Sequence, residues 1–203
     1  MRPKAFRNDL NHVLEAKCFL FLFYRDELTY SILQTFLMMG SKIIKRRKKC
    51  FFLKNYHHLW QLEKAIQAIQ EYDATQLQLS VLGKLGDDCI ANDKQLKTAK
   101  KDLKEYWKGS LGSASDFGLF CNPEIGTLFI AGYLASQFLH DISGKTLGEM
   151  TSGPYGILRG IGIAEKDSFT FLKALNEHAF LLILRGYDDE LDRVEARLES
   201  LEE

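Results

Sequence analysis

The chain has 203 residues, of which 46% are hydrophobic and 27% are charged, as is usual for soluble globular proteins. This composition excludes disorder for most of the chain, and equal numbers of basic and acidic residues give no whole-chain reason to expect a polyanionic partner. The charges are unevenly distributed, however: residues 1–49 hold 11 basic and 4 acidic side chains, and residues 50–203 hold the other 16 basic and 23 acidic ones. We predict an N-terminal helical and basic arm, residues 1–46, and an α+β domain, residues 47–203.

The arm combines an apolar helical pattern with a basic run. Leu28, Ile32 and Phe36 recur every four residues, which predicts a helix, and Gly40 is suited to end it. The run Lys42–Lys49 has six basic residues in eight, a density typical of segments that bind nucleic acid or anionic lipid or that direct nuclear import. Because the run has no interleaved aromatic residues, we favour a solvated linker. A misassigned gene start is a further explanation of the arm.

The cysteines are few and widely spaced. Cys18, Cys50, Cys89 and Cys121 are at least 32 residues apart and form no Cys-x-x-Cys pair. We therefore expect reduced, buried thiols and a cytoplasmic protein. The apolar block Cys18–Tyr24 is too short to span a membrane, and charged residues rather than a signal-peptide cleavage site follow it.

The first half of the domain has the pattern strand, helix, strand, helix. Residues 50–53 form a short apolar strand, and Asn55 is suited to cap a helix whose apolar residues share one face. Residues 76–82 alternate apolar and polar side chains, which is the period of a β-strand. A lysine-rich helix is expected over residues 94–107.

The second half predicts two further strands. Residues 126–132 form a strand after an Asn122–Pro123 turn, and a helix follows over residues 133–140. Residues 179–185 are an apolar run that is typical of a strand covered on both faces, and Asp188 is suited to cap the last helix.

These elements predict an α+β fold of ferredoxin-like type, with two βαβ halves on one antiparallel sheet. The second crossover is unusually long. It belongs to a region, Gly109–Gly162, that holds 11 of the 15 glycines, so we expect a long glycine-rich helical insertion there.

A likeness to a known family rests on five stretches, which are Gln76–Lys84, Tyr106–Gly112, Asn122–Gly132, Leu158–Ile163 and Phe180–Gly186. In this order they resemble the bacterial general stress protein 17M-like family, over roughly residues 48–200. The family is largely uncharacterised and some members are labelled permeases, so the resemblance implies a stress-associated role and no catalytic residue. The chain departs from the family pattern at Ala164, where the family usually has proline, and its centre is more polar, which argues against membrane insertion.

No group of side chains has the spacing of a reactive site, so we predict no catalytic, cofactor-binding or metal-binding residue. The pair Gly160–Gly162 before a helix is compatible with a bound phosphate, but Glu165 places a negative charge where that phosphate would lie. His57, His58 and His178 lie near predicted helix ends, and we interpret them as structural caps.

Two pairs of small residues, Gly132 with Ser136 and Gly156 with Gly160, favour close packing within the domain or across a homodimer over packing in a membrane. We predict a non-enzymatic, stress-associated module that acts through self-association or protein binding, with a homo-oligomer as the expected state. The alternative is a peripheral membrane or transport-associated protein held by the basic arm and the glycine-rich segment, and an enzyme is a third option. No small-molecule substrate is identified, and binding of an anionic membrane or nucleic acid through Lys42–Lys49 is not favoured.

Overall fold

A computed structural model describes residues 48–72, 77–89, 93–112 and 115–201. The chain divides into two units, Met1–Arg46 and Arg47–Glu203. The helix expected in the arm, Cys18 and most of the basic run Lys42–Lys49 lie outside the described residues. The description that follows concerns the second unit.

The second unit is built on a five-stranded antiparallel sheet in the order β1-β7-β2-β4-β3. The strands are β1 (Lys49–Tyr56), β2 (Gln78–Gly86), β3 (Phe117–Asn122), β4 (Gly126–Gly132) and β7 (Phe180–Tyr187). The predicted α+β class and antiparallel sheet are therefore confirmed, and each of the four predicted strands is present. The structure adds β3, which we did not predict.

Two crossover connections join pairs of these strands. In each pair, a third strand lies between the two connected strands in the sheet. Helix α3 (Leu59–Glu71) leads from β1 to β2, and β7 lies between those two strands. Helices α5 (Ala135–Phe138), α6 (Gly153–Gly160) and α7 (Glu165–Asn176) lie between β4 and β7 in the chain, and β2 separates those strands in the sheet.

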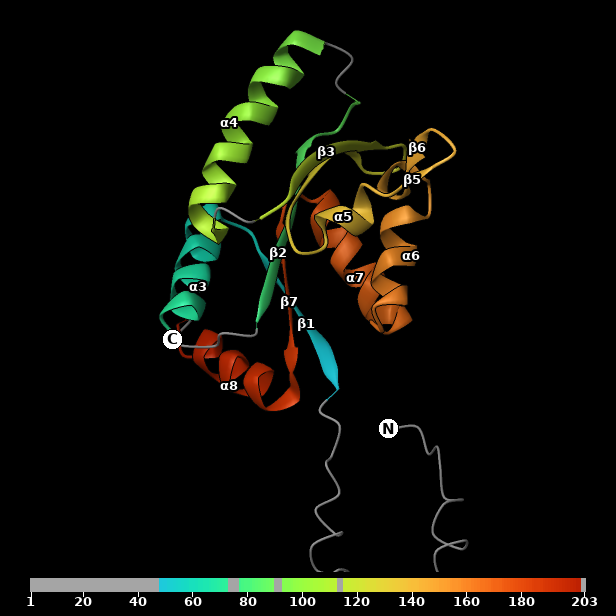
Figure 1. Ribbon diagram of the computed structural model, residues 1–203. Coiled ribbons are helices and arrows are strands. Elements are labelled where there is room, and N and C mark those ends of the chain that lie inside the picture. Colours follow the sequence, from blue (N-terminus) through green and yellow to red (C-terminus); the bar gives the residue numbers. More distant parts are fainter. Residues whose placement is uncertain (1–47, 73–76, 90–92, 113–114, 202–203) are drawn as a thin grey trace, which may run out of the picture. The chain divides into compact units, whose positions relative to one another are not determined.

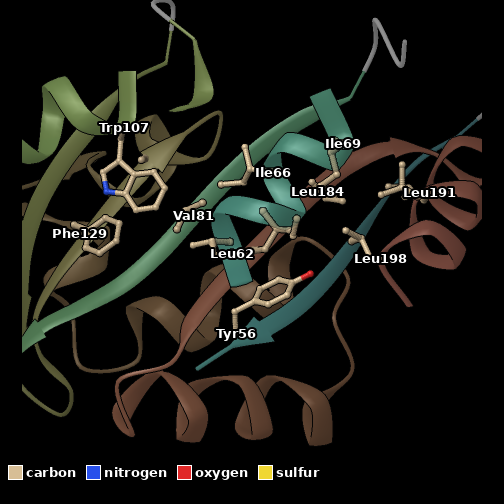
Figure 2. Close-up of a cluster of buried hydrophobic side chains, with 14 of the residues drawn as sticks. Tyr56, Leu62, Ile66, Ile69, Val81, Trp107, Phe129, Leu184, Leu191 and Leu198 are labelled. Carbon is tan, nitrogen blue, oxygen red and sulfur yellow. The ribbon is translucent and has the colours of Figure 1, made fainter. Parts of the chain in front are cut away.

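Helices cover both faces of the sheet (Figure 1). On one face, α3 packs with α4 (Asp93–Leu111) and α8 (Asp188–Glu199) over a cluster of apolar side chains. Figure 2 shows Leu62 and Ile66 of α3 near Val81 of β2, and Trp107 of α4 beside Phe129 of β4. The ring centroids of Trp107 and Phe129 are 5.3 Å apart. Full burial of one such aliphatic side chain contributes about 1.5–3 kcal/mol, so this cluster fixes the helices on the sheet.

The opposite face is covered by α5, α6 and α7, which pack on a second apolar cluster. Leu181 and Ile183 of β7 point into this second cluster, whereas Leu182 and Leu184 point into the first. Successive side chains of a strand face opposite sides of the sheet, so a strand with a helix layer on each side needs apolar residues throughout. This explains the continuous apolar run predicted as a doubly covered strand.

Two boundaries differ from the prediction. Strand β1 continues through Tyr56, so Asn55 lies in the strand and the residue that precedes α3 is His58. Strand β3 was not predicted because Gly118, the second of its six residues, weakens strand propensity. A Cβ atom at Gly118 would lie 2.2 Å from Leu139 Cδ1, so the close approach of Leu139 requires glycine there.

The glycine-rich segment folds into compact structure against the sheet. The helix predicted over residues 133–140 is the single turn α5, and a short hairpin of β5 (Asp141–Ile142) and β6 (Lys145–Thr146), the 3₁₀ turn η1 (Leu147–Glu149) and helix α6 follow it. The buried Asn122 amide donates to the carbonyls of Gly148 (3.0 Å) and Met150 (2.8 Å), which ties η1 to the turn after β3. Within the described ranges, no helix combines the length and the apolar character needed to cross a membrane.

The cysteine prediction is wrong for one pair. Cys89, after β2, and Cys121, in β3, form a disulfide, with their Cα atoms 5.4 Å apart. That separation lies within the usual range for a disulfide. Strand pairing across β4 brings together two residues that are 32 positions apart, which sequence spacing alone does not reveal. Cys50 is a free, half-buried thiol.

A hydrogen bond between α4 and α3 makes stability sensitive to alkaline pH. Burial, followed by the hydrogen bond that Tyr106 donates to Glu63 Oε1, raises the pKa of Tyr106 from 10.0 to about 12. Between pH 10 and 12 the unfolded chain loses this proton and the folded chain keeps it, so stability must fall as pH rises. We expect Tyr106→Phe to flatten this part of the curve in denaturant titrations at pH 9–11. Parallel curves for the two proteins would contradict the assignment.

Candidate functional site

Basic and aromatic side chains alternate at the end of the sheet where β1 begins and β7 ends. Lys49 and Phe51 lie on β1, and the register places them opposite Tyr187 and Arg185 of β7. Each cross-strand pair therefore joins one cation to one ring. All four side chains are partly exposed, so they form a surface that is both charged and aromatic.

The contacts within these pairs are of the cation–π type. Lys49 Nζ lies 5.4 Å from the centroid of the Tyr187 ring. The Arg185 guanidinium carbon lies 5.8 Å from the Phe51 ring and 5.2 Å from the ring of Tyr133, which follows β4 and is 46% exposed. Distances under about 6 Å are those at which a cation is attracted to a ring face. We call Lys49, Phe51, Tyr133, Arg185 and Tyr187 the cation–aromatic shelf.

Arg185 is held in place by two hydrogen bonds that use the same nitrogen. Its Nη1 donates to Gln78 Oε1 at 2.7 Å and to the Tyr133 hydroxyl at 3.1 Å. Gln78 stands opposite Arg185 in the β2–β7 register. Among the described residues, Nε and Nη2 have no such acceptor, and this edge of a guanidinium matches two oxygens of a carboxylate or phosphate. The arrangement thus presents an anchored guanidinium whose bidentate edge has no acceptor in the part of the chain that the structure describes.

The shelf lies on the face of the sheet that α5, α6 and α7 cover elsewhere. Phe51 lies two residues from Leu53 on β1, and Arg185 lies two residues from Ile183 on β7, so each pair points to the same face of the sheet. The side chains of Leu53 and Ile183 belong to the second apolar cluster. The acidic first turn of α8, Asp188–Glu190, lies next to Tyr187 in the chain, but α8 packs on the other face. The anchored cations and exposed rings are therefore on a side of the sheet separate from that helix.

Sequence reasoning missed the shelf because its residues come from three separate segments. The signal that was present is a pair of i, i+2 patterns, Lys49-Cys-Phe51 and Arg185-Gly-Tyr187, each at a strand end and each combining a cation with an aromatic ring. Antiparallel pairing of the two strands places these patterns opposite one another. Lys49 is also the last residue of the basic run Lys42–Lys49, so the fold places aromatic side chains beside the end of that run.

A second polar cluster surrounds a buried lysine and has a structural explanation. Lys84 Nζ donates to the Asn176 carbonyl (3.1 Å) and to Asn176 Oδ1 (2.8 Å), at the C-terminus of α7. It also lies 2.5 Å from Asp87 Oδ1, and its hydrogen bond lowers the pKa of that carboxyl. His178 Nε2 is 3.6 Å from the same oxygen. The ammonium satisfies carbonyl groups that a helix end leaves unpaired, so we assign this cluster to holding α7 against β2.

The histidines and the glycine pair examined in the sequence lie at helix ends. The His58 carbonyl accepts a hydrogen bond from the Gln61 N–H at 3.1 Å, so His58 is the N-cap residue of α3 rather than part of its first turn. His178 follows α7 in a left-handed conformation, with a φ of 63°. Gly160 is the last residue of α6, Gly162 lies between α6 and α7, and α7 has Glu165 in its first turn. The structure does not bring these residues together into one site.

The pairs of small residues differ in their surroundings. A Cβ atom at Gly132 would lie 2.2 Å from the Leu79 carbonyl oxygen, so Gly132 permits close contact between β4 and β2, whereas Ser136 is exposed. Gly156 and Gly160 are exposed and would have no atom within 4 Å of an added Cβ. Close packing inside the domain therefore explains Gly132 alone.

A surface pocket and a metal centre are two other kinds of site. A pocket of about 290 Å³ lies between α3 and α8 and is lined by Tyr56, Trp60, Gln61, Lys64, Ala65, Leu198 and Leu201. Lys64 already donates to the Leu201 carbonyl at 3.4 Å, so few polar groups converge there and we assign it no ligand. In the part of the chain that the structure describes, no three His, Cys, Asp or Glu side chains form a group able to hold a metal ion.

Comparisons with protein-family models, with curated proteins and with solved structures found no match for this chain. The resemblance to the general stress protein 17M-like family therefore stays a prediction. Functional inference rests on the geometry of the shelf.

Proposed function

We propose that residues 47–203 form a non-enzymatic binding module whose binding surface is the cation–aromatic shelf, and that the ligand carries anionic groups. The observation that supports this most strongly is Arg185, which is anchored through Nη1 while its Nε and Nη2 edge has no acceptor among the described residues. Arginine with this geometry recognises carboxylates and phosphates through two parallel hydrogen bonds. The neighbouring cation Lys49 adds a second positive charge.

The test of this proposal uses the full chain and two anionic probes, poly-L-glutamate and oligothymidylate. Arg185→Gln removes the charge and the bidentate edge, and a charge-assisted hydrogen bond contributes about 1.5–3 kcal/mol, so binding should weaken roughly 10- to 150-fold. Lys101→Gln, on the exposed surface of α4, is the matched control. Unaltered melting would show that both variants fold. The proposal fails if wild type binds neither probe or if Arg185→Gln binds both as tightly as wild type.

Self-association is a second candidate function, because β1 ends the strand order of the sheet among the described residues. Strand β1 is the edge strand beside β7, and no strand pairs with its outer side in the described ranges. Edge strands pair readily with a second copy of the same chain. This supports the expected homo-oligomer and, more generally, action through a protein partner. Light scattering over a concentration series tests it, and a monomer at every concentration contradicts it.

The remaining functional expectations belong to the same proposal. The stress-associated role rests on the family resemblance, and a strain that lacks the gene should tolerate stress less well than its parent.

The peripheral membrane alternative rests on Lys42–Lys49 and the glycine-rich segment, and pelleting of the full chain with anionic vesicles tests it. A cytoplasmic location is proposed from low cysteine use, although the Cys89–Cys121 disulfide is unusual for that compartment.

We also propose that the fold is of ferredoxin-like type with a long glycine-rich helical insertion. The two split crossovers support a ferredoxin-like arrangement. The chain between β4 and β7, which contains α5, α6 and α7, supports the insertion.

A further inference from the structure

We infer that the ligand of the cation–aromatic shelf is a single-stranded nucleic acid, an inference that rests on the binding surface proposed above. Such a strand carries a phosphate and a flat base in every nucleotide, so it needs cations and exposed rings in alternation. The shelf supplies this alternation across two strands, with Lys49 opposite Tyr187 and Phe51 opposite Arg185. Proteins that bind single strands combine aromatic stacking with basic grooves.

Each part of the shelf corresponds to one part of a nucleotide. The Nε and Nη2 edge of Arg185, which has no acceptor among the described residues, matches two oxygens of a phosphodiester. The Tyr133 ring is nearly half exposed, and Arg185 contacts it on one side, so a base can use the exposed part of this ring. A base pair inside a duplex hides both of its faces by stacking, and the inference is therefore restricted to unpaired strands.

The basic run adjoins the shelf in the sequence. Lys42–Lys49 carries six basic residues in eight and ends on the shelf at Lys49, the first residue of β1. From the sequence alone, a solvated linker is the favoured interpretation of this run, because the run itself contains no aromatic residues. The fold places the rings of Phe51 and Tyr187 beside its last residue, and the charge of the run is suited to the phosphates that flank a stacked nucleotide.

An acidic peptide and an anionic membrane are the competing ligands. An acidic peptide would use Arg185 and Lys49 but would have no need of the rings. A membrane would use the basic run but would not require the bidentate edge of Arg185. Replacing rings while keeping every charge therefore separates the three ligands.

The experiment measures binding of the full chain to labelled dT12 and rU12, to a duplex of the same length, to poly-L-glutamate and to vesicles with phosphatidylglycerol. Tyr133→Leu and Phe51→Leu each remove a ring of the shelf. Tyr133→Phe keeps the ring and removes the hydroxyl that accepts from Arg185. Phe169→Leu, which replaces an exposed ring on α7, is the matched control. Stacking of one base on an aromatic ring corresponds to a roughly 5- to 150-fold change in affinity.

We expect wild type to bind dT12 or rU12 at least tenfold more tightly than the duplex or poly-L-glutamate, with affinity falling as salt rises. Tyr133→Leu and Phe51→Leu should each weaken this binding at least fivefold, while Tyr133→Phe keeps more of it than Tyr133→Leu and Phe169→Leu changes nothing. Equal binding of poly-L-glutamate, tighter binding of vesicles, or ring variants that bind dT12 and rU12 as wild type does would overturn the inference. If Arg185→Gln still weakened poly-L-glutamate binding, the proposed anion-binding surface would stand without nucleic acid. If Arg185→Gln changed the affinity for none of the probes, both the proposed anion-binding surface and the nucleic-acid inference would fail.

Discussion

Replacing Ile183 with alanine is expected to lower the free energy of unfolding by about 2–5 kcal/mol. Ile183 is 1% exposed and lies in β7, between Leu53 of β1 and Ser80 of β2. Its side chain belongs to the apolar cluster beneath α5, α6 and α7. Alanine removes the transfer free energy of three carbons and leaves a cavity between rigid strands. Urea titration measures the change, provided that the denaturant slope stays constant.

The matched control for this substitution is Ile183→Val, which removes one methylene group and should cost about 0.5–1.5 kcal/mol. The two variants together give a size series at one position. A loss below about 1 kcal/mol for Ile183→Ala would show that β7 is not an internal strand covered on both faces.

Gly132→Ala is expected to lower the free energy of unfolding by a similar amount, about 2–5 kcal/mol. The backbone of Gly132 is left-handed, with a φ of 99°, which costs a residue with a Cβ about 1–2 kcal/mol. The new Cβ would also lie 2.2 Å from the Leu79 carbonyl oxygen, and overpacking of this kind costs roughly 1–3 kcal/mol. Thermal or urea unfolding tests the prediction.

The effect of Gly132→Ala should extend to the shelf, because Tyr133 is the next residue. Gly132 sets the direction in which the chain leaves β4, and the Tyr133 N–H then donates to the Leu79 carbonyl at 3.0 Å. Gly156→Ala is the control, since that position in α6 has open space around it and an alanine there should stabilise the helix by about 0.5–1 kcal/mol. Equal stability of the two variants would contradict the role assigned to Gly132.

The sequence predicts those parts of the fold in which one segment carries a complete local signal. The alternation over residues 76–82 and the apolar run over residues 179–185 both correspond to strands, because burial on one or two faces dictates those patterns. Strand β3 has no such pattern, since Gly118 is selected by contact with Leu139 rather than by strand propensity. The disulfide partner of Cys89 is likewise set by strand order.

The candidate site could not be predicted in the same way. Its cations and rings are brought together by the registers of β1 with β7 and of β2 with β7, and register depends on contacts between distant segments. Lys49 belongs to a basic run in the sequence, but Tyr133, directly after β4, and Tyr187, at the end of β7, are far from it along the chain. Arg185 in particular stands in a run that reads as ordinary buried strand.

The most direct test of the binding surface is chemical-shift mapping of the isotopically labelled full chain during titration with dT12. The shelf predicts that the largest changes fall on Lys49, Phe51, Tyr133 and Tyr187 and on the Nε–H resonance of Arg185, while the exposed lysines of α4 stay unchanged. Changes confined to α4, or no changes at a dT12 concentration that saturates the chain, would contradict the claim that this end of the sheet is the binding surface.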